Sequence, residues 1–369
     1  MNEAMRSFCK DMLGELLYRT GYYDYLKKAY LGGTRRGIIL CYHRVKDDSV
    51  CARTDGSWHH SFELGVSLSN FRAQMEFLRR HMTPVPLSDI QDFIEGGPFL
   101  PENAVAVTFD DGYQDSYTVA YPILCQYEIP ATIFVTTGLI ETGRLNWWDS
   151  LFEIVRRTTK ARLDLRSIRA FGESRKRDGA VVLALDSVQG RESACNLLMQ
   201  LLRSVPDHER EPAVAMVRRE LEVEDGCDAR DLMLSWTQMR AMAEELVEFG
   251  AHTVTHPCLS RLPLKVAEME IGDSKASVEA HLKRPVVGFA YPYGEYNDQI
   301  KSLVKGKGFK YACSSLYGTV SHKSDGFELP RVGLTEAVPS RIAHRLVAAL
   351  RSDGIQWTES VTESTASVS

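Results

Sequence analysis

From residue 37 onward, short apolar runs alternate with segments of helical periodicity, and this alternation constrains the fold more than any other feature. The run 37–43 has the composition of a buried strand, and Phe71, Met75, Leu78 and Met82 recur on one face of a helix. Strands that alternate with helices form a parallel sheet, so the chain is predicted to be an α/β protein. Further strands are predicted near 104–107, 131–135, 247–252, 286–291, 311–314 and 327–332, with a helix over 117–127.

Carboxylates and histidines follow two of these strands directly. The run 104–107 leads into Thr-Phe-Asp-Asp-Gly-Tyr at 108–113, and the run 247–251 leads into His-Thr-Val-Thr-His-Pro at 252–257. Functional side chains that come from the ends of several different strands are typical of a (β/α) barrel, whose sites lie at the carboxyl ends of its strands. We therefore prefer a barrel to an open sheet.

The residue types in these two stretches indicate a hydrolytic metal site. One carboxylate and two imidazoles supply three protein ligands and leave a position for water, as catalytic divalent sites do. Adjacent strand residues point to opposite sides, so one aspartate can face a metal ion while the other acts as a base. Single histidines are mostly core or surface groups, but two of them beside Pro257, together with an upstream acidic pair, favour the metal interpretation. Cys258 as a fourth ligand would close the site and is disfavoured.

Composition limits the classes of partner and compartment. The net charge is -5, and the 25% of charged residues intersperse both signs, which argues against a nucleic-acid partner. Eight cysteines are dispersed without a Cys-x-x-Cys pair, a pattern typical of reduced thiols. Residues 1–30 lack an apolar core of signal-peptide length, and no apolar run is long enough to span a bilayer. These features predict a cytoplasmic protein.

Three segments stand outside the alternation. Residues 1–36 combine helical apolar spacing with lysine, arginine and tyrosine, which predicts an amphipathic helix that packs across the barrel or, as a less favoured alternative, makes peripheral contact with the inner membrane surface. Residues 150–232 are rich in arginine and glutamate with helical apolar spacing, so a helical insertion is expected to interrupt a barrel domain over 37–345. The Ser/Thr-rich residues 358–369 are predicted to be disordered.

Three motifs, taken in order, resemble those of a known family. The stretches 108–113 and 252–257, followed by Tyr-Pro-Tyr-Gly at 291–294, resemble the first three motifs of the polysaccharide deacetylases, the NodB-homology group or carbohydrate esterase family four. Leu-Cys-Tyr-His-Arg-Val at 40–45 is similar to the first strand of many bacterial members. The resemblance covers roughly 37–150 and 232–335.

The resemblance implies a distorted (β/α) barrel and metal-dependent removal of an N-acetyl group from an amino sugar. By this resemblance Asp111, His252 and His256 would bind a divalent ion, usually zinc in the family, with cobalt, nickel or manganese as alternatives. Asp110 would act as the general base. A backbone N–H at Tyr293 would stabilise the negative charge that develops on the amide oxygen.

The sequence departs from the family pattern in two places. Many members carry an arginine shortly before the proline of the third motif, but residues 288–292 contain none. Arg331, where a late strand should end, is a substitute that could orient Asp110. The Leu-x-x-His motif of the leaving-group acid is also missing, so His43, after the first strand, becomes a candidate acid, against the alternative of an ordinary core or surface histidine.

Aromatic residues near the motifs fit a carbohydrate or glycolipid substrate. Trp148, Tyr291 and Tyr293 could stack on sugar faces, although core packing accounts for them equally well. Three functions remain open. The favoured one is an N-deacetylase acting on an oligosaccharide, a lipid-linked saccharide or a related glycan precursor. The others are an amidase of the same fold that cleaves a non-carbohydrate C–N bond, and a sugar-binding protein that retains the metal without turnover.

Overall fold

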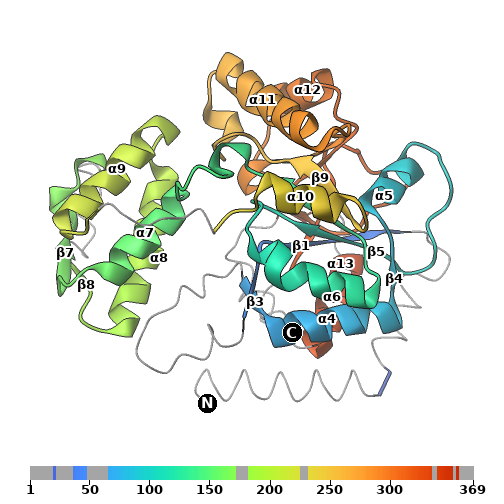
Figure 1. The fold of residues 1–369 in the computed structure, drawn as a ribbon, viewed down its shortest axis with the longest axis horizontal. Helices are drawn as coiled ribbons and strands as arrows, with labels where there is room; N and C mark the ends of the chain where they lie inside the picture. Colours follow the sequence, from blue (N-terminus) through green and yellow to red (C-terminus); the bar gives the residue numbers. More distant parts are fainter. Residues whose placement is uncertain are drawn as a thin grey trace. The chain divides into compact units, whose positions relative to one another are not determined.

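The computed structural model describes residues 20–21, 36–47, 65–171, 182–224, 232–334, 339–351 and 355–356. The chain divides into two compact units, drawn in Figure 1. The first comprises Met1–Asp47, Glu63–Gly138 and Leu234–Ser369, and the second comprises Asp48–Phe62 and Leu139–Met233. The predicted tail 358–369 lies outside the described residues, and so does the predicted N-terminal segment except for 20–21 and 36.

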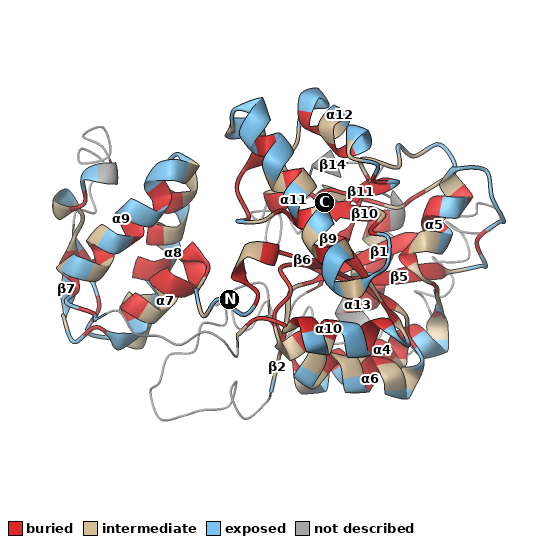
Figure 2. Cartoon of the chain, turned by 45° about the horizontal axis from the view of Figure 1, so that its top comes forward, coloured by how far each residue is buried: buried red, intermediate tan, exposed pale blue. Residues whose placement is uncertain are grey.

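The first unit is built on an eight-stranded parallel sheet in the order β11-β10-β9-β6-β5-β1-β13, with β4 paired to β5. Parallel strands covered on both faces are nearly continuous apolar runs, and every residue of β1, β5 and β6 is buried (Figure 2). The strands are β1 (Ile38–Tyr42), β4 (Thr83–Pro84), β5 (Ala104–Phe109), β6 (Ala131–Val135), β9 (Val247–Ala251), β10 (Gly288–Ala290), β11 (Tyr311–Cys313) and β13 (Val332–Gly333).

The segment that leads into β13 links the two edges of this sheet. Leu329 forms a parallel bridge with Cys313 of β11, and Val332 pairs with Leu40 of β1. Pro330 between them has no backbone N–H to donate, so the strand predicted over 327–332 is interrupted and only its end belongs to β13. The sheet thereby closes into a distorted (β/α) barrel, which confirms the predicted fold class.

Glycines make room for two large side chains of the barrel core. A Cβ atom at Gly250 would lie 2.4 Å from the ring of Phe134, and one at Gly288 would lie 2.5 Å from the ring of Tyr311. Both rings are buried. Any larger residue at these glycines would displace an aromatic ring from the close-packed core.

Helices pack around the strands of the first unit. Helix α4 begins after Ser67, whose hydroxyl accepts a hydrogen bond from a first-turn N–H, and the predicted Phe71, Met75 and Leu78 are buried on one face. The helix predicted over 117–127 consists of a π-helical turn, η1, followed by α6. The bounds are α4 (Leu68–His81), α5 (Leu87–Ile94), η1 (Ser116–Ala120), α6 (Tyr121–Tyr127), α10 (Trp236–Ala243), α11 (Leu264–Leu282), α12 (Asp298–Gly306) and α13 (Pro339–Arg351).

Two short strand pairs complete the described part of the first unit. Strand β2 (Arg44–Lys46) pairs in parallel with β3 (Gly65–Ser67), and β12 (Leu316–Tyr317) pairs antiparallel with β14 (Ile355–Gln356). Both pairs lie outside the barrel sheet.

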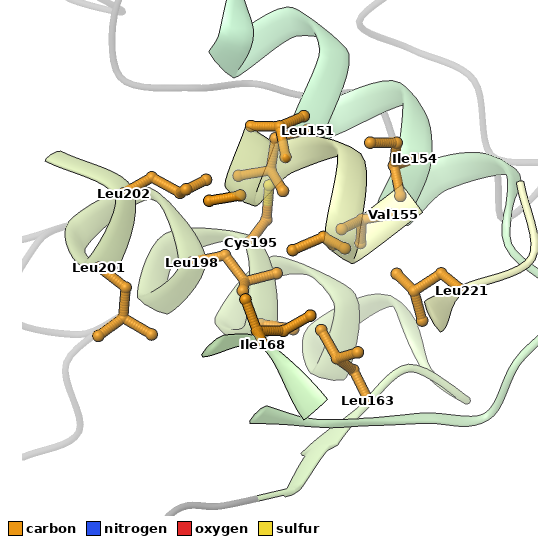
Figure 3. Close-up of a cluster of buried hydrophobic side chains, with 14 of the residues drawn as sticks. Leu151, Ile154, Val155, Leu163, Ile168, Cys195, Leu198, Leu201, Leu202 and Leu221 are labelled. Carbon is orange, nitrogen blue, oxygen red and sulfur yellow. The ribbon is translucent and has the colours of Figure 1, made fainter. Parts of the chain in front are cut away.

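The second unit has a hydrophobic core of its own. Side chains from α7, α8 and the segments beside them meet there, among them Leu151, Ile154 and Leu198 (Figure 3). The stretch Leu139–Met233 of this unit overlaps the helical insertion predicted over 150–232. Trp147 and Trp148, which precede the predicted insertion, also belong to its core. The α-helices and strands in its described part are α7 (Trp147–Arg157), β7 (Arg162–Asp164), β8 (Val182–Ala184), α8 (Val188–Ser204) and α9 (Asp207–Glu220).

Replacing Leu198 by alanine is expected to destabilise the second unit by about 2–5 kcal/mol, because the side chain is fully buried and its removal leaves a cavity. Asn196→Ala, at an exposed position of the same helix, should change stability by less than about 0.5 kcal/mol. Urea denaturation followed by circular dichroism measures both. Equal stability of the two variants would contradict the core assignment.

Candidate metal centre

Asp111, His252 and His256 lie together just beyond the carboxyl ends of β5 and β9. The Nε2 atoms of His252 and His256 are 3.6 and 3.4 Å from Oδ1 of Asp111, and all three residues are buried. These separations exceed the ~2.7–3.2 Å of ordinary hydrogen bonds. Two tetrahedral ligands that are each ~2.0–2.1 Å from one zinc ion lie roughly 3.3 Å apart. The three residues therefore form a group that could hold one divalent metal ion.

The chain turns sharply where β5 ends. Asp111 and Gly112 have φ of 71° and 83°, in the left-handed region, and the N–H of Gly112 donates to the carbonyl of Asp110 at 2.9 Å. A non-glycine residue in this region costs energy, and such residues cluster at functional sites. In this turn the Asp111 carboxylate lies beside the histidines, while Asp110 contacts Arg331.

Both histidines are poised as neutral ligands. Nδ1 of His252 lies 2.8 Å from the carbonyl oxygen of Ala290, which can only accept, so Nδ1 carries the proton and Nε2 keeps its lone pair. Burial lowers the pKa of His252, and it lowers the pKa of His256 still further below the usual value. The neutral form of imidazole is the one that binds a divalent ion.

Asp110 is held as a carboxylate by Arg331. The guanidinium donates from Nη1 and Nη2 to the two carboxylate oxygens, each at 2.7 Å, and from Nε to the carbonyl of Ser314 at 3.2 Å. Burial opposes ionisation of Asp110, but the charge and hydrogen bonds of Arg331 outweigh it and hold the pKa of the carboxyl well below its usual range. The structure thus brings Arg331, the candidate orienting residue, into contact with Asp110.

Replacing Arg331 by methionine is expected to destabilise the protein by about 3–5 kcal/mol, because it leaves the buried Asp110 carboxylate without its partner. The same change in an Asp110→Asn background should cost clearly less, since the amide carries no charge. Urea denaturation of the native protein, both single variants and the double variant gives the coupling energy. A coupling energy near zero would show that the pair is not the stabilising contact seen here.

His43 also lies close to this pair. It follows β1, is half-buried, and has a ring nitrogen within 4.8 Å of both an Asp110 oxygen and the Cys41 sulfur. The Cys41 thiol donates to Oδ2 of Asp110 at 3.7 Å. The structure therefore brings the candidate acid to the candidate base.

Tyr293 lies beside the histidines. Tyr293 has φ of 57° within the turn η7 (Pro292–Gly294). Its ring meets that of His256 edge-on, with the ring centroids 4.7 Å apart. This turn follows directly from β10, and Gly294 at its end has no room for a side chain because a Cβ atom would lie 2.2 Å from Ser315. Tyr293 is therefore fixed next to the candidate metal ligands.

Two residues that the sequence predicts to bind substrate are buried in hydrophobic cores. Tyr291 is fully buried, its hydroxyl donates to the carbonyl of Phe327 at 3.2 Å, and its ring stacks on that of Tyr296 at 4.7 Å. Trp148 is buried in the core of the second unit. This burial favours the packing interpretation for both residues, and their contact with substrate stays a prediction.

Sequence reasoning missed two residues that hold the loop between the histidines. The Thr253 hydroxyl donates to the carbonyl of His252 at 2.5 Å and accepts from the N–H of His256 at 3.0 Å. The position of Thr253 between the two histidines is a signal in the sequence that could identify it. Glu270 accepts hydrogen bonds from the loop at Val254 and Thr255, and no spacing in the sequence points to it.

The profile of the family described as polysaccharide deacetylase matches residues 99–166 and 198–312 of this chain. These two stretches contain the acidic pair and both histidines. The chain belongs to the polysaccharide deacetylase family.

Two named relatives are poly-β-1,6-N-acetyl-D-glucosamine N-deacetylases. The one from Escherichia coli strain K12 is 36% identical over 95 residues, which cover 26% of this chain and 13% of that protein. The one from Staphylococcus aureus strain MSSA476 is 34% identical over 105 residues, which cover 27% of this chain and 36% of that protein. The matches thus span well under two thirds of the relatives' own length.

Solved structures share the fold over most of this chain. A Streptococcus pyogenes deacetylase in complex with acetate superposes with a TM-score of 0.55 at 19% identity, covering 85% of this chain and 98% of the other. IcaB from Ammonifex degensii superposes with a TM-score of 0.51 at 20% identity, covering 86% and 98%. At these identities the likeness concerns the fold alone, and it agrees with the barrel described above.

Proposed function

We propose that this protein is a metal-dependent hydrolase that removes N-acetyl groups from amino-sugar units of a glycan. One observation carries the proposal: a buried Asp-His-His group with the spacing of ion ligands adjoins a carboxylate that is kept ionised. The two relatives named as poly-β-1,6-N-acetyl-D-glucosamine N-deacetylases support this substrate class. The first substrate to test is therefore a short β-1,6-linked N-acetylglucosamine oligomer.

Asp111, His252 and His256 would hold the divalent ion. Zinc suits one carboxylate and two imidazoles with an open position, and cobalt, nickel and manganese are the alternatives. When bound, such an ion polarises the amide carbonyl and makes a water molecule more acidic. The buried, neutral imidazoles fit this role because they need no proton removed before they bind.

The remaining residues either transfer protons or hold the reacting groups. Asp110 accepts a proton from the attacking water as the new C–O bond forms, and Arg331 holds the carboxylate in place. The backbone N–H of Tyr293 donates to the amide oxygen as it gains negative charge. His43 gives a proton to the nitrogen as the C–N bond breaks. The products are acetate and the free amine of the sugar.

The other two functions differ from this one in what they predict. An amidase of the same fold would release no acetate from amino sugars, and a protein that only binds sugar would have no use for an ionised Asp110 beside the ligand group. The zinc-loaded protein should lower the mass of the oligomer by one acetyl group after another, and mass spectrometry measures this loss. Binding of the oligomer without any loss of mass would favour the sugar-binding function, and neither binding nor hydrolysis would favour the amidase.

The cytoplasmic location and a peripheral contact with the inner membrane surface stay predictions. The segment 1–36, which prompted the membrane prediction, lies outside the described residues except for 20–21 and 36. Among the helices that the structure describes, none has the length and apolar character to cross a bilayer. Sedimentation of the protein with liposomes, with and without residues 1–36, tests the contact; equal partitioning of the two would rule it out.

A further inference from the structure

The two candidate histidine ligands are joined by a loop that lacks regular secondary structure. Histidines four positions apart on a helix would be fixed by helical hydrogen bonds, but residues 252–256 form no helix. Thr253 and His256 have φ of 67° and 58°, which L residues rarely adopt. The geometry of this loop must therefore be imposed by groups around it.

One side of the loop is held by the chain that follows β6. The carbonyl of Thr253 accepts from the N–H of Thr137 at 3.2 Å, and the carbonyl of Val254 accepts from the N–H of Gly138 at 2.8 Å. These bonds use the loop's carbonyls only. Its N–H groups point to other partners.

The loop's N–H groups at Val254 and Thr255 are bound by a single carboxylate. Oε2 of Glu270 accepts from the N–H of Val254 at 2.8 Å and from the N–H of Thr255 at 2.9 Å. Oε1 accepts from the hydroxyl of Thr255 at 2.7 Å. Hydrogen bonds from N–H groups to a carboxylate oxygen are stronger than those between neutral groups, and here two successive N–H groups share one such oxygen.

Glu270 is presented by a well-anchored helix. It lies on α11, where Ala267, Ile271 and Ser274 are fully buried, and this helix packs against β9, the strand that ends at the first histidine. The carboxylate is thus fixed relative to the same strand that delivers His252. A shift of the Glu270 side chain would be transmitted to the loop and hence to the separation of the two Nε2 atoms.

We propose that Glu270 is a positioning residue of the metal centre: it holds the 253–255 backbone so that both histidines face Asp111. The inference rests on the metal site of the proposed function but not on its substrate. Residues that do not bind the metal themselves but orient its ligands typically raise the metal affinity by about 10- to 100-fold. Loss of the Glu270 carboxylate should therefore weaken zinc binding by about this factor.

Glu268, also on α11, offers a matched control. Its carboxylate accepts a hydrogen bond from the half-buried Lys307 amine at 2.7 Å, a contact outside the loop. Glu268→Ala removes the same charge from the same helix, so it reproduces any general electrostatic or helical effect of the change.

The test measures zinc affinity by competition with a chromogenic chelator in the full-length protein. Glu270→Ala is expected to bind zinc about 10- to 100-fold more weakly than the native protein, whereas Glu268→Ala should match the native protein. Glu270→Gln, which keeps the shape and one acceptor oxygen, should fall between them. Melting temperatures of the metal-free proteins are measured in parallel, because a merely structural role would lower them without changing the affinity of the folded protein.

Native zinc affinity in whichever of the two Glu270 variants folds would overturn the proposal. An equal loss of affinity in Glu268→Ala would overturn it too, since the effect would then be general to the helix. If the native protein binds no zinc, or binds it no more tightly than the His256→Ala variant does, the assignment of the metal centre itself is wrong. A zinc-binding protein without deacetylase activity would remove only the proposed function.

Discussion

Asp110→Asn is expected to retain zinc and to lose about 10²–10⁴-fold or more in kcat/KM for release of acetate. The amide has the shape of the carboxylate but cannot take a proton from water at neutral pH. The variant also leaves Asp111, His252 and His256 intact, so the candidate ligand set is unchanged. Steady-state kinetics on the β-1,6-linked oligomer, with zinc content measured by atomic emission on the same sample, separates the two effects.

The contact between Asp110 and Arg331 means that the stability of the Asn variant must be measured as well. In the Asn variant the guanidinium loses its charged partner, and burial of an unpaired cation lowers stability. Circular dichroism and a melting curve therefore accompany the kinetics, so that lost activity is not confused with lost fold. Hydrolysis at the native rate by a folded Asn variant would show that Asp110 is not the base.

His256→Ala is expected to lose both the metal and the activity. Only two of the three protein ligands would remain, and the loss of affinity should exceed the ~10–100-fold that is typical of removing a residue behind a ligand. Zinc content after dialysis should fall to background, with acetate release falling in parallel. Because metal and turnover disappear together here, the contrast with Asp110→Asn assigns different roles to the two residues.

His281→Ala is the matched control for this variant. His281 is exposed on α11, stacks against Trp236 with ring centroids 3.8 Å apart, and takes no part in the ligand group. It should bind zinc and hydrolyse substrate like the native protein. A His256→Ala protein with a full complement of zinc would remove this residue from the metal centre.

Local patterns in the sequence were enough to predict the barrel and the edge of the sheet at which the candidate ligands lie. Buried parallel strands such as 104–109 are nearly continuous apolar runs, and this signal needs no knowledge of distant contacts. The polar residues that follow such strands must lie at the carboxyl edge of the sheet, which is why Asp111 and His252 were expected to meet. The structure places them with His256 in one buried group.

Features that depend on three-dimensional packing could not be predicted in the same way. Tyr291 stands inside a motif, yet whether its ring faces solvent or core depends on Phe289 and Tyr296 around it. Closure of the barrel depends on Leu329 and Val332 pairing with different strands on either side of a proline. Glu270 reaches the loop 253–255 only because α11 packs on β9, a contact without any signature in sequence spacing.

Anomalous diffraction at the zinc edge from crystals of the zinc-loaded protein tests the central claim most directly. We predict a single strong peak within bonding distance, about 2.0–2.2 Å, of Nε2 of His252, Nε2 of His256 and a carboxylate oxygen of Asp111, with the Asp110–Arg331 pair intact beside it. A strong peak elsewhere, with none between these three side chains, would contradict the account.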